Sequence, residues 1–118
     1  MEMENVFWAL GRKVYPLYPE FVAAVTAYQQ DIAPDRSGWH PEQKIAETPI
    51  QITYEALWKN EDDLLNLSIG TPGHGVTMGE ILFTLNNESY SFFREVDTCF
   101  FEGLTWVSGN TYRLRVGS

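Results

Sequence analysis

Hydrophobic and polar residues repeat with two different periods along this chain of 118 residues, and each period predicts one kind of element. Four apolar residues recur at helical spacing: Phe21, Val25, Tyr28 and Ile32. This spacing predicts an amphipathic helix, with Pro19 well suited to its first turn and Pro34 at its end. Residues 1–13 have no clear period, and a short helix is one interpretation of them.

Strict alternation predicts a first β-hairpin in the middle of the chain. Apolar residues occupy every second position of its first strand: Ile50, Ile52, Tyr54, Ala56 and Trp58. The acidic turn 60–63 leads to a second apolar stretch at 64–69. A four-residue turn pairs Tyr54 with Ile69, which places the apolar side chains of both strands on one face. This hairpin is therefore expected to have one buried face and an acidic tip.

A second hairpin is predicted near the end of the chain, where Gly109 and Asn110 suit a two-residue turn. Alternation from this turn gives a face that we interpret as core: Cys99, Phe101, Val107, Tyr112, Leu114 and Val116. The opposite face then carries Phe100, Glu102, Leu104, Trp106, Arg113 and Arg115. In this register Trp106 lies across from Arg113, a favourable cation–π arrangement. The apolar residues of this second face need cover from a helix of the domain or from a partner.

Three glycines in the stretch 71–80 have a spacing that resembles a phosphate-binding loop. Thr77 and Glu80, however, form a capping-box signature, which predicts a helix from Thr77 to about Phe93 with a weak point at 86–87. Glu80 would repel a phosphate, the P-loop lysine is missing, and the preceding stretch is predicted as a hairpin strand. We therefore interpret the stretch as a loop that opens a helix.

Together these elements predict a single α+β domain over residues 1–118. An antiparallel sheet of about four strands, formed by the two hairpins, packs with two or three helices in the order α-β-β-α-β-β. The longest irregular segment, 33–49, contains Trp39 and His40. Long loops in compact domains are often functional, but Trp39 is expected to anchor this one on the core.

The formal net charge is −8, from sixteen acidic and eight basic residues. This balance argues against nucleic-acid binding, which needs a basic surface, and it is compatible with a basic protein partner. No apolar run approaches the roughly 20 residues of a membrane helix, and the first residues carry acids where a secretory signal carries bases. With Cys99 as the single cysteine, these features predict a cytoplasmic protein that does not enter a membrane.

Residues with catalytic or metal-binding chemistry are sparse. His40 and His74 are the two histidines, and Cys99 lies in an apolar stretch, where a thiol behaves as a small hydrophobe. No local signature joins these residues into a nucleophile and its base. Neither histidines nor carboxylates show the spacing of a zinc or calcium site. We therefore expect no enzymatic activity and no cofactor, and we assign no catalytic or metal-binding residue.

The favoured hypothesis is a non-enzymatic binding domain that masks a basic partner, such as a nuclease toxin, by charge complementarity. Acidic immunity proteins act in this way, and the size and composition of the chain are typical of that class, although no motif assigns it to a particular family. The expected contact residues are Asp35, Glu42, Glu61, Asp62, Asp63, Glu102 and Trp106.

Two alternatives stay open. A homodimer or other homo-oligomer would bury the apolar residues Phe100, Leu104 and Trp106 in its interface. A small-molecule-binding protein or enzyme would use the 33–49 loop, with Trp39 and His40 as its notable side chains.

Overall fold

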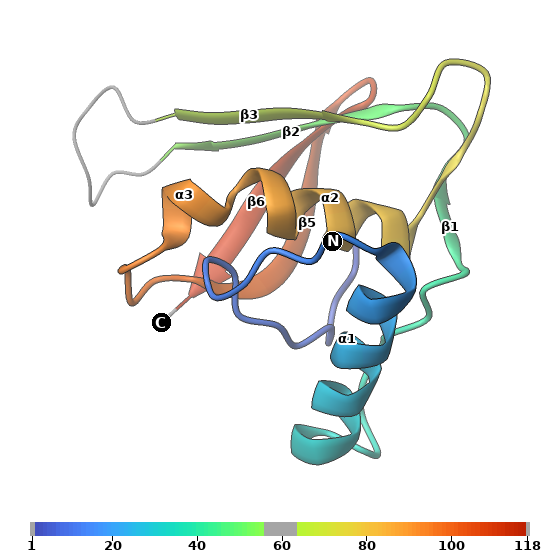
Figure 1. Cartoon of the computed structure of the whole chain (residues 1–118). Helices are drawn as coiled ribbons and strands as arrows, with labels where there is room; N and C mark the ends of the chain where they lie inside the picture. The colour runs from blue at the N-terminus through green and yellow to red at the C-terminus, as the bar shows by residue number, and fades with distance from the viewer. Residues whose placement is uncertain (1, 56–63, 118) are drawn as a thin grey trace.

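The computed structural model describes residues 2–55 and 64–117, which form three helices and six strands (Figure 1). The helices are α1 (Tyr18–Ile32), α2 (Met78–Glu88) and α3 (Tyr90–Phe93). The strands are β1 (Lys44–Ala46), β2 (Ile50–Glu55), β3 (Leu64–Ile69), β4 (Val76–Thr77), β5 (Phe100–Ser108) and β6 (Thr111–Gly117). The α+β class is confirmed. Apart from the short β1, β4 and α3, the elements follow the predicted order.

The main sheet has four strands in the order β3-β2-β6-β5. Each predicted hairpin is present as an antiparallel pair, β2 with β3 and β5 with β6. The central strands β2 and β6 are parallel, however, with Ile52 opposite Tyr112, so the expectation of an antiparallel sheet is wrong at its centre. Alternation along a strand determines which side chains share a face, but it does not determine which strands of two hairpins meet. The short strands β1 and β4 form a separate antiparallel pair.

The helices lie on one face of the main sheet, where α2 packs against the strands and α1 packs on α2 (Figure 1). The core between the layers includes these buried strand residues: Ile50, Ile52, Leu65, Ile69, Phe101, Leu104 and Leu114. The helix α2 contributes Ile81, Leu82 and Leu85 to it. The opposite face of the sheet carries polar side chains that are partly or fully exposed: Gln51, Thr53, Glu55, Asn66, Ser68, Arg113 and Arg115. The domain therefore buries one face of its sheet and exposes the other.

The N-terminal segment, residues 2–10, forms no helix: it turns at residues 4 and 5 and is bridged to β5 at two points, so the interpretation of this segment as a short helix is wrong. Backbone bridges join Glu2 to Leu104 and Ala9 to Phe100. Val6 and Leu10 are buried. The sequence of this segment shows no helical period, and its backbone forms hydrogen bonds with the β5 region instead. Tertiary contacts therefore determine its conformation.

The first hairpin keeps the predicted faces but not the predicted register. Tyr54 lies opposite Leu65, not Ile69, and Ile50 lies opposite Ile69. The pairing is displaced by an even number of residues, so the apolar side chains still share one face. The predicted strand residues 56–59 and the acidic tip 60–63 lie outside the described residues.

The second hairpin has the predicted turn at Gly109 and Asn110, and Ser108 lies opposite Thr111. Beyond this pair the register shifts between Trp106 and Ser108, and again between Phe101 and Gly103. Each irregularity adds one residue to β5, and one added residue exchanges the faces of all the residues that follow.

Three predictions for this hairpin are wrong as a consequence of the shifts. Leu104 lies opposite Leu114 and is fully buried, whereas it was expected on the outer face. Val107, expected in the core, is exposed. Trp106 lies opposite Tyr112 rather than Arg113, so the expected cation–π pair does not form.

The helix predictions from local signals are largely confirmed. Pro19 lies in the first turn of α1, which ends at Ile32. The Glu80 amide donates to the Thr77 hydroxyl at 3.2 Å, as the capping box predicts. The break in the second helical stretch falls at Ser89, between α2 and α3, rather than at 86–87. The Ser89 hydroxyl donates to the Leu85 carbonyl, and this local bond competes with continued helix.

Candidate functional site

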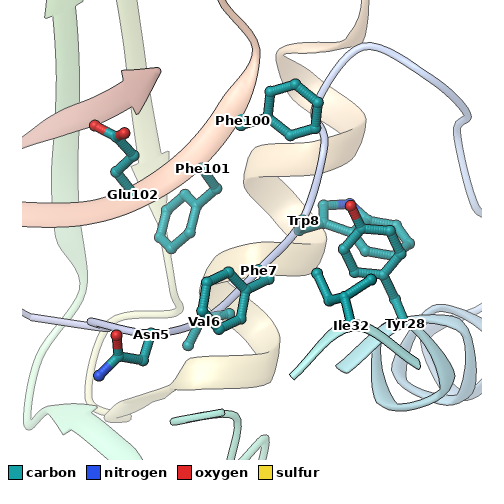
Figure 2. A pocket seen from close by; sticks show the side chains of 9 residues that line it. All are labelled: Asn5, Val6, Phe7, Trp8, Tyr28, Ile32, Phe100, Phe101 and Glu102. Atoms are coloured by element: carbon teal, nitrogen blue, oxygen red, sulfur yellow. The ribbon is translucent and has the colours of Figure 1, made fainter. Parts of the chain in front are cut away.

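A groove of about 400 Å³ opens between the last turns of α1, the N-terminal segment and the start of β5 (Figure 2). Its wall is mainly aromatic and aliphatic: Phe7, Trp8, Tyr28, Ile32, Phe100 and Phe101. Glu102 is the one charged residue among those that line it, and it lies toward one end of the groove (Figure 2). The volume is within the range of small ligand and side-chain pockets, about 300–1,000 Å³.

The Gln29 side chain holds the N-terminal segment against α1. Its Oε1 accepts from the Phe7 amide at 2.9 Å, and its Nε2 donates to the Phe7 carbonyl. Gln29 is buried, and its primary amide forms the pair of bonds that a neighbouring strand would form. The Ser37 hydroxyl also donates to Oε1, at 2.8 Å. These contacts fix the backbone of Phe7 against α1.

Trp8 is fixed by one hydrogen bond and by ring contacts. Its indole Nε1 donates to Asn86 Oδ1 at 3.0 Å. Its ring meets Phe21 and Tyr28 edge to face, each with centroids 5.5 Å apart. Edge-to-face rings at this separation attract one another beyond the burial of their surface. The aromatic wall of the groove is therefore held in place before any ligand arrives.

Two apolar side chains remain open to solvent at the mouth of the groove. Phe100 is 39% exposed and Ile32 is 43% exposed. Ile32 was predicted on the buried face of its helix, but α1 projects beyond the core and buries Gln29 instead. A cation already contacts one ring of the groove, because the Arg36 guanidinium carbon lies 5.6 Å from the centroid of Phe7. Aromatic rings accept cations over their faces at this distance.

The acidic residues that the structure describes lie at the surface, and nearly all of them are without an ion-pair partner there. Thirteen of the sixteen acids fall within the described residues, and every one of them is exposed. Among those residues one ion pair is present, between Lys44 Nζ and Glu47 Oε2 at 3.3 Å. The other twelve described carboxylates therefore present their charge to solvent.

The structure distributes the predicted contact residues over separate parts of the surface. Glu102 lines the groove, and Asp35 lies in the turn after α1, next to the residue that stacks on Phe7. Glu42 lies near Tyr18 at the opposite end of α1, and Trp106 lies at the tip of the second hairpin. The predicted contacts at 61–63 lie outside the described residues.

A second hollow, of about 340 Å³, is lined in part by Tyr18, Glu80 and Phe83. Burial raises the pKa of the Tyr18 hydroxyl, and the carboxylates of Glu42 and Glu80 raise it further against a hydrogen bond with Thr77 that lowers it. A tyrosine with a raised pKa stays protonated at neutral pH. It therefore offers a hydrogen-bonding group, not a general base.

The 33–49 loop contributes Pro34, Ser37 and Trp39 to a smaller hollow, of about 180 Å³, against α1. Trp39 is buried, with 8% of its surface exposed, and its indole Nε1 donates to Thr26 Oγ1 at 3.0 Å. Its role as the anchor of the loop is confirmed. His40 is exposed, and Cys99 is buried in the core. Within residues 2–55 and 64–117, no three His, Cys, Asp or Glu side chains are close enough together to hold a metal ion.

Comparisons with known protein families, with curated proteins and with solved structures found no match to this chain. In the part of the chain that the structure describes, no helix is long and apolar enough to cross a membrane.

Sequence reasoning identified Glu102 but missed the groove that surrounds it. The wall comes from three segments that are distant in the chain: residues 5–8, Tyr28 with Ile32, and residues 100–102. Each aromatic residue alone is typical of a core position. The one signal available was the N-terminal stretch, whose aromatic residues fit neither a helical nor a strand period.

Proposed function

We propose that this chain is a non-enzymatic protein-binding domain that masks a basic partner, in the manner of acidic immunity proteins that neutralise nuclease toxins. The observation that carries the proposal is the surface charge: every described carboxylate is exposed, and one has an ion-pair partner. Such a surface attracts a basic partner over long range and disfavours acidic ones. Masking then follows from covering the partner's basic surface.

The groove supports the same proposal by supplying apolar contacts. Binding energy at protein interfaces is concentrated in a few buried aromatic or arginine anchors, and exposed charges at the rim contribute mainly to association rate. Phe100 and Ile32 provide an exposed apolar surface beside Glu102 and Asp35. We therefore propose the groove, with these two acids, as the centre of the interface. Glu42 and Trp106 are proposed as peripheral contacts.

The test is a capture experiment with the tagged protein in lysate of its own host, followed by native mass analysis. We expect a one-to-one complex with a basic protein that forms at low salt and dissociates as salt rises, because screening weakens exposed charge pairs. The double variant Asp35→Asn, Glu102→Gln is expected to weaken the complex about tenfold or more. The matched control, Glu20→Gln with Glu88→Gln, removes the same charge from exposed helix positions.

Three outcomes would contradict the proposal. A complex that is insensitive to salt would rule out charge complementarity as its basis. Equal weakening by the test and control variants would show that net charge acts without a defined interface. A clean monomer with no basic partner at any salt concentration would remove the masking function itself.

A homodimer is the second candidate, favoured by the 60% exposure of Trp106 at the hairpin tip. Leu104, the third member of the expected apolar patch, is buried within the protomer, so the patch is smaller than the sequence predicted. Mass analysis at micromolar concentration tests this candidate. A dimer that the Trp106→Glu variant abolishes would support it, and a monomer would contradict it.

A further inference from the structure

We propose that the groove binds an arginine side chain of the basic partner, with the guanidinium plane on an aromatic ring and its edge toward the Glu102 carboxylate. The inference rests on the proposed function for the origin of the arginine. The chemistry of the groove is argued independently of that origin. The groove itself belongs to the described part of the chain and is open to solvent through Phe100 and Ile32.

The composition of the wall selects the charge of the ligand. An apolar ligand would contact the rings without using the Glu102 carboxylate, which is exposed at the rim. An anion would be repelled by Glu102 and by the net charge of −8. A cation with an apolar stem contacts the rings and is attracted by Glu102. Charge complementarity therefore specifies a basic side chain.

The shape and polarity of the wall favour arginine over lysine. A guanidinium is planar, stacks on aromatic faces and is weakly hydrated, so it loses less on leaving water than a compact ammonium does. Its parallel N–H groups also match the two oxygens of a carboxylate. The Arg36 guanidinium carbon lies 5.6 Å from the Phe7 centroid, so a ring of this groove already accepts a cation over its face.

The groove is ordered before binding, which limits the entropy lost on association. Gln29 holds the Phe7 backbone, and Asn86 holds the Trp8 indole. The Glu102 side chain is exposed at the rim, and its carboxylate lies near Gly117 of β6 and points away from the rings (Figure 2). The proposed contact therefore requires this exposed side chain to rotate toward the groove.

The test uses three small probes on the intact chain: N-acetyl-arginine amide, N-acetyl-lysine amide and N-acetyl-citrulline amide. Citrulline has the shape of arginine without its charge. Backbone amide chemical shifts are followed during titration at low salt. We expect saturable shifts at the groove residues and an affinity order of arginine, lysine, citrulline, with arginine about three- to tenfold above citrulline.

Variants assign the effect to Glu102. Glu102→Gln is expected to bring arginine to the affinity of citrulline and to leave citrulline binding unchanged. Glu20→Gln removes the same charge from an exposed position in the first turn of α1, about 12 Å along the helix from Tyr28 by the helical rise, and is expected to change neither. Phe100→Ala is expected to weaken all three probes. Circular dichroism shows whether each variant is folded.

The outcomes separate this inference from the proposed function. Equal affinity for arginine and citrulline, or equal effects of Glu102→Gln and Glu20→Gln, overturns the arginine site. If a captured basic partner binds the Glu102→Gln and Phe100→Ala variants as tightly as it binds the native chain, the arginine site is also overturned, while the masking function stands. Arginine binding in the groove without any basic partner supports the chemistry of the site and contradicts the masking function.

Discussion

The two ends of β5 each expose an aromatic residue, but they differ in everything around it. At the start of the strand Phe100 lies beside the N-terminal segment and α1, and the three together enclose the groove (Figure 2). At the other end Trp106 lies on the hairpin tip with 60% of its surface exposed. The two positions are six residues, or roughly 20 Å, apart. Exposure alone therefore does not define a binding site, since a concave surface needs neighbouring elements to build it.

The hydrogen bonds at the two ends show the same contrast. At the groove end, Leu10 donates to the Cys99 carbonyl and Phe101 donates to the Trp8 carbonyl, so a distant segment holds the strand. At the tip, the Trp106 indole donates to the carbonyl of Gly109, three residues away. The groove end depends on the whole fold, whereas the tip depends on its own turn. The following predictions test this difference, starting with the largest expected effect.

Truncation of Leu104 and of Trp106 should differ in effect, although simple alternation places both side chains on the outer face. Leu104→Ala leaves a cavity in the core and is expected to lower the free energy of unfolding by about 2–5 kcal/mol. Trp106→Ala, which removes a larger but exposed side chain, is expected to lower it by less than about 1 kcal/mol. Urea denaturation measures both. A larger loss for Trp106→Ala would mean that the tip is packed and that the contrast is wrong.

Two glycines with positive φ provide an intermediate test. Gly11 has φ +75°, and an added Cβ would lie 2.5 Å from the backbone carbon of Phe93, whereas Gly109 has φ +53° and open space around it. Gly109→Ala is expected to cost only the left-handed strain, about 1–2 kcal/mol. Gly11→Ala adds a backbone clash and is expected to cost about 2–4 kcal/mol. Equal losses of stability for the two variants in thermal or urea unfolding would show that the backbone around Gly11 adjusts to the added methyl group.

The smallest effect is expected at Tyr18, at the end of α1 that lies away from the groove. Its pKa is raised in the folded state, chiefly by burial, so its contribution to stability is present below the unfolded pKa of about 10 and is lost as pH rises through the folded value. Between about pH 9 and about pH 11, the free energy of unfolding should therefore fall more for the native chain than for the Tyr18→Phe variant. Parallel pH profiles for the two proteins would contradict the raised pKa.

Local signals predicted the parts of the fold that depend on a few neighbouring residues. The capping box at Thr77 and Glu80, the proline in the first turn of α1 and the turn at Gly109 are present as predicted. The anchoring of Trp39 is also confirmed. Each of these features follows from a backbone or side-chain preference that acts over one turn, so the surrounding fold does not need to be known.

Predictions that required counting along a strand or comparing strands were less successful. The alternation rule placed Phe101 correctly and Leu104 on the wrong face, because two irregularities in β5 lie on either side of Leu104. A shift of one residue has no signature in hydrophobicity alone. The parallel pairing of β2 with β6 was likewise invisible, since both hairpins look the same in sequence whichever strand lies inside.

The candidate site depended most strongly on tertiary contacts. The net charge of −8 and the scarcity of catalytic residues are properties of composition, and they led to the hypothesis of a basic partner without any coordinates. The groove has no such source. The bridges of residues 2–10 to β5 and the contact of Gln29 with Phe7 bring together lining residues as distant in sequence as Asn5 and Glu102, which are 97 positions apart. Composition acts through long-range fields that need no register, whereas a pocket exists only where packed side chains from distant segments meet.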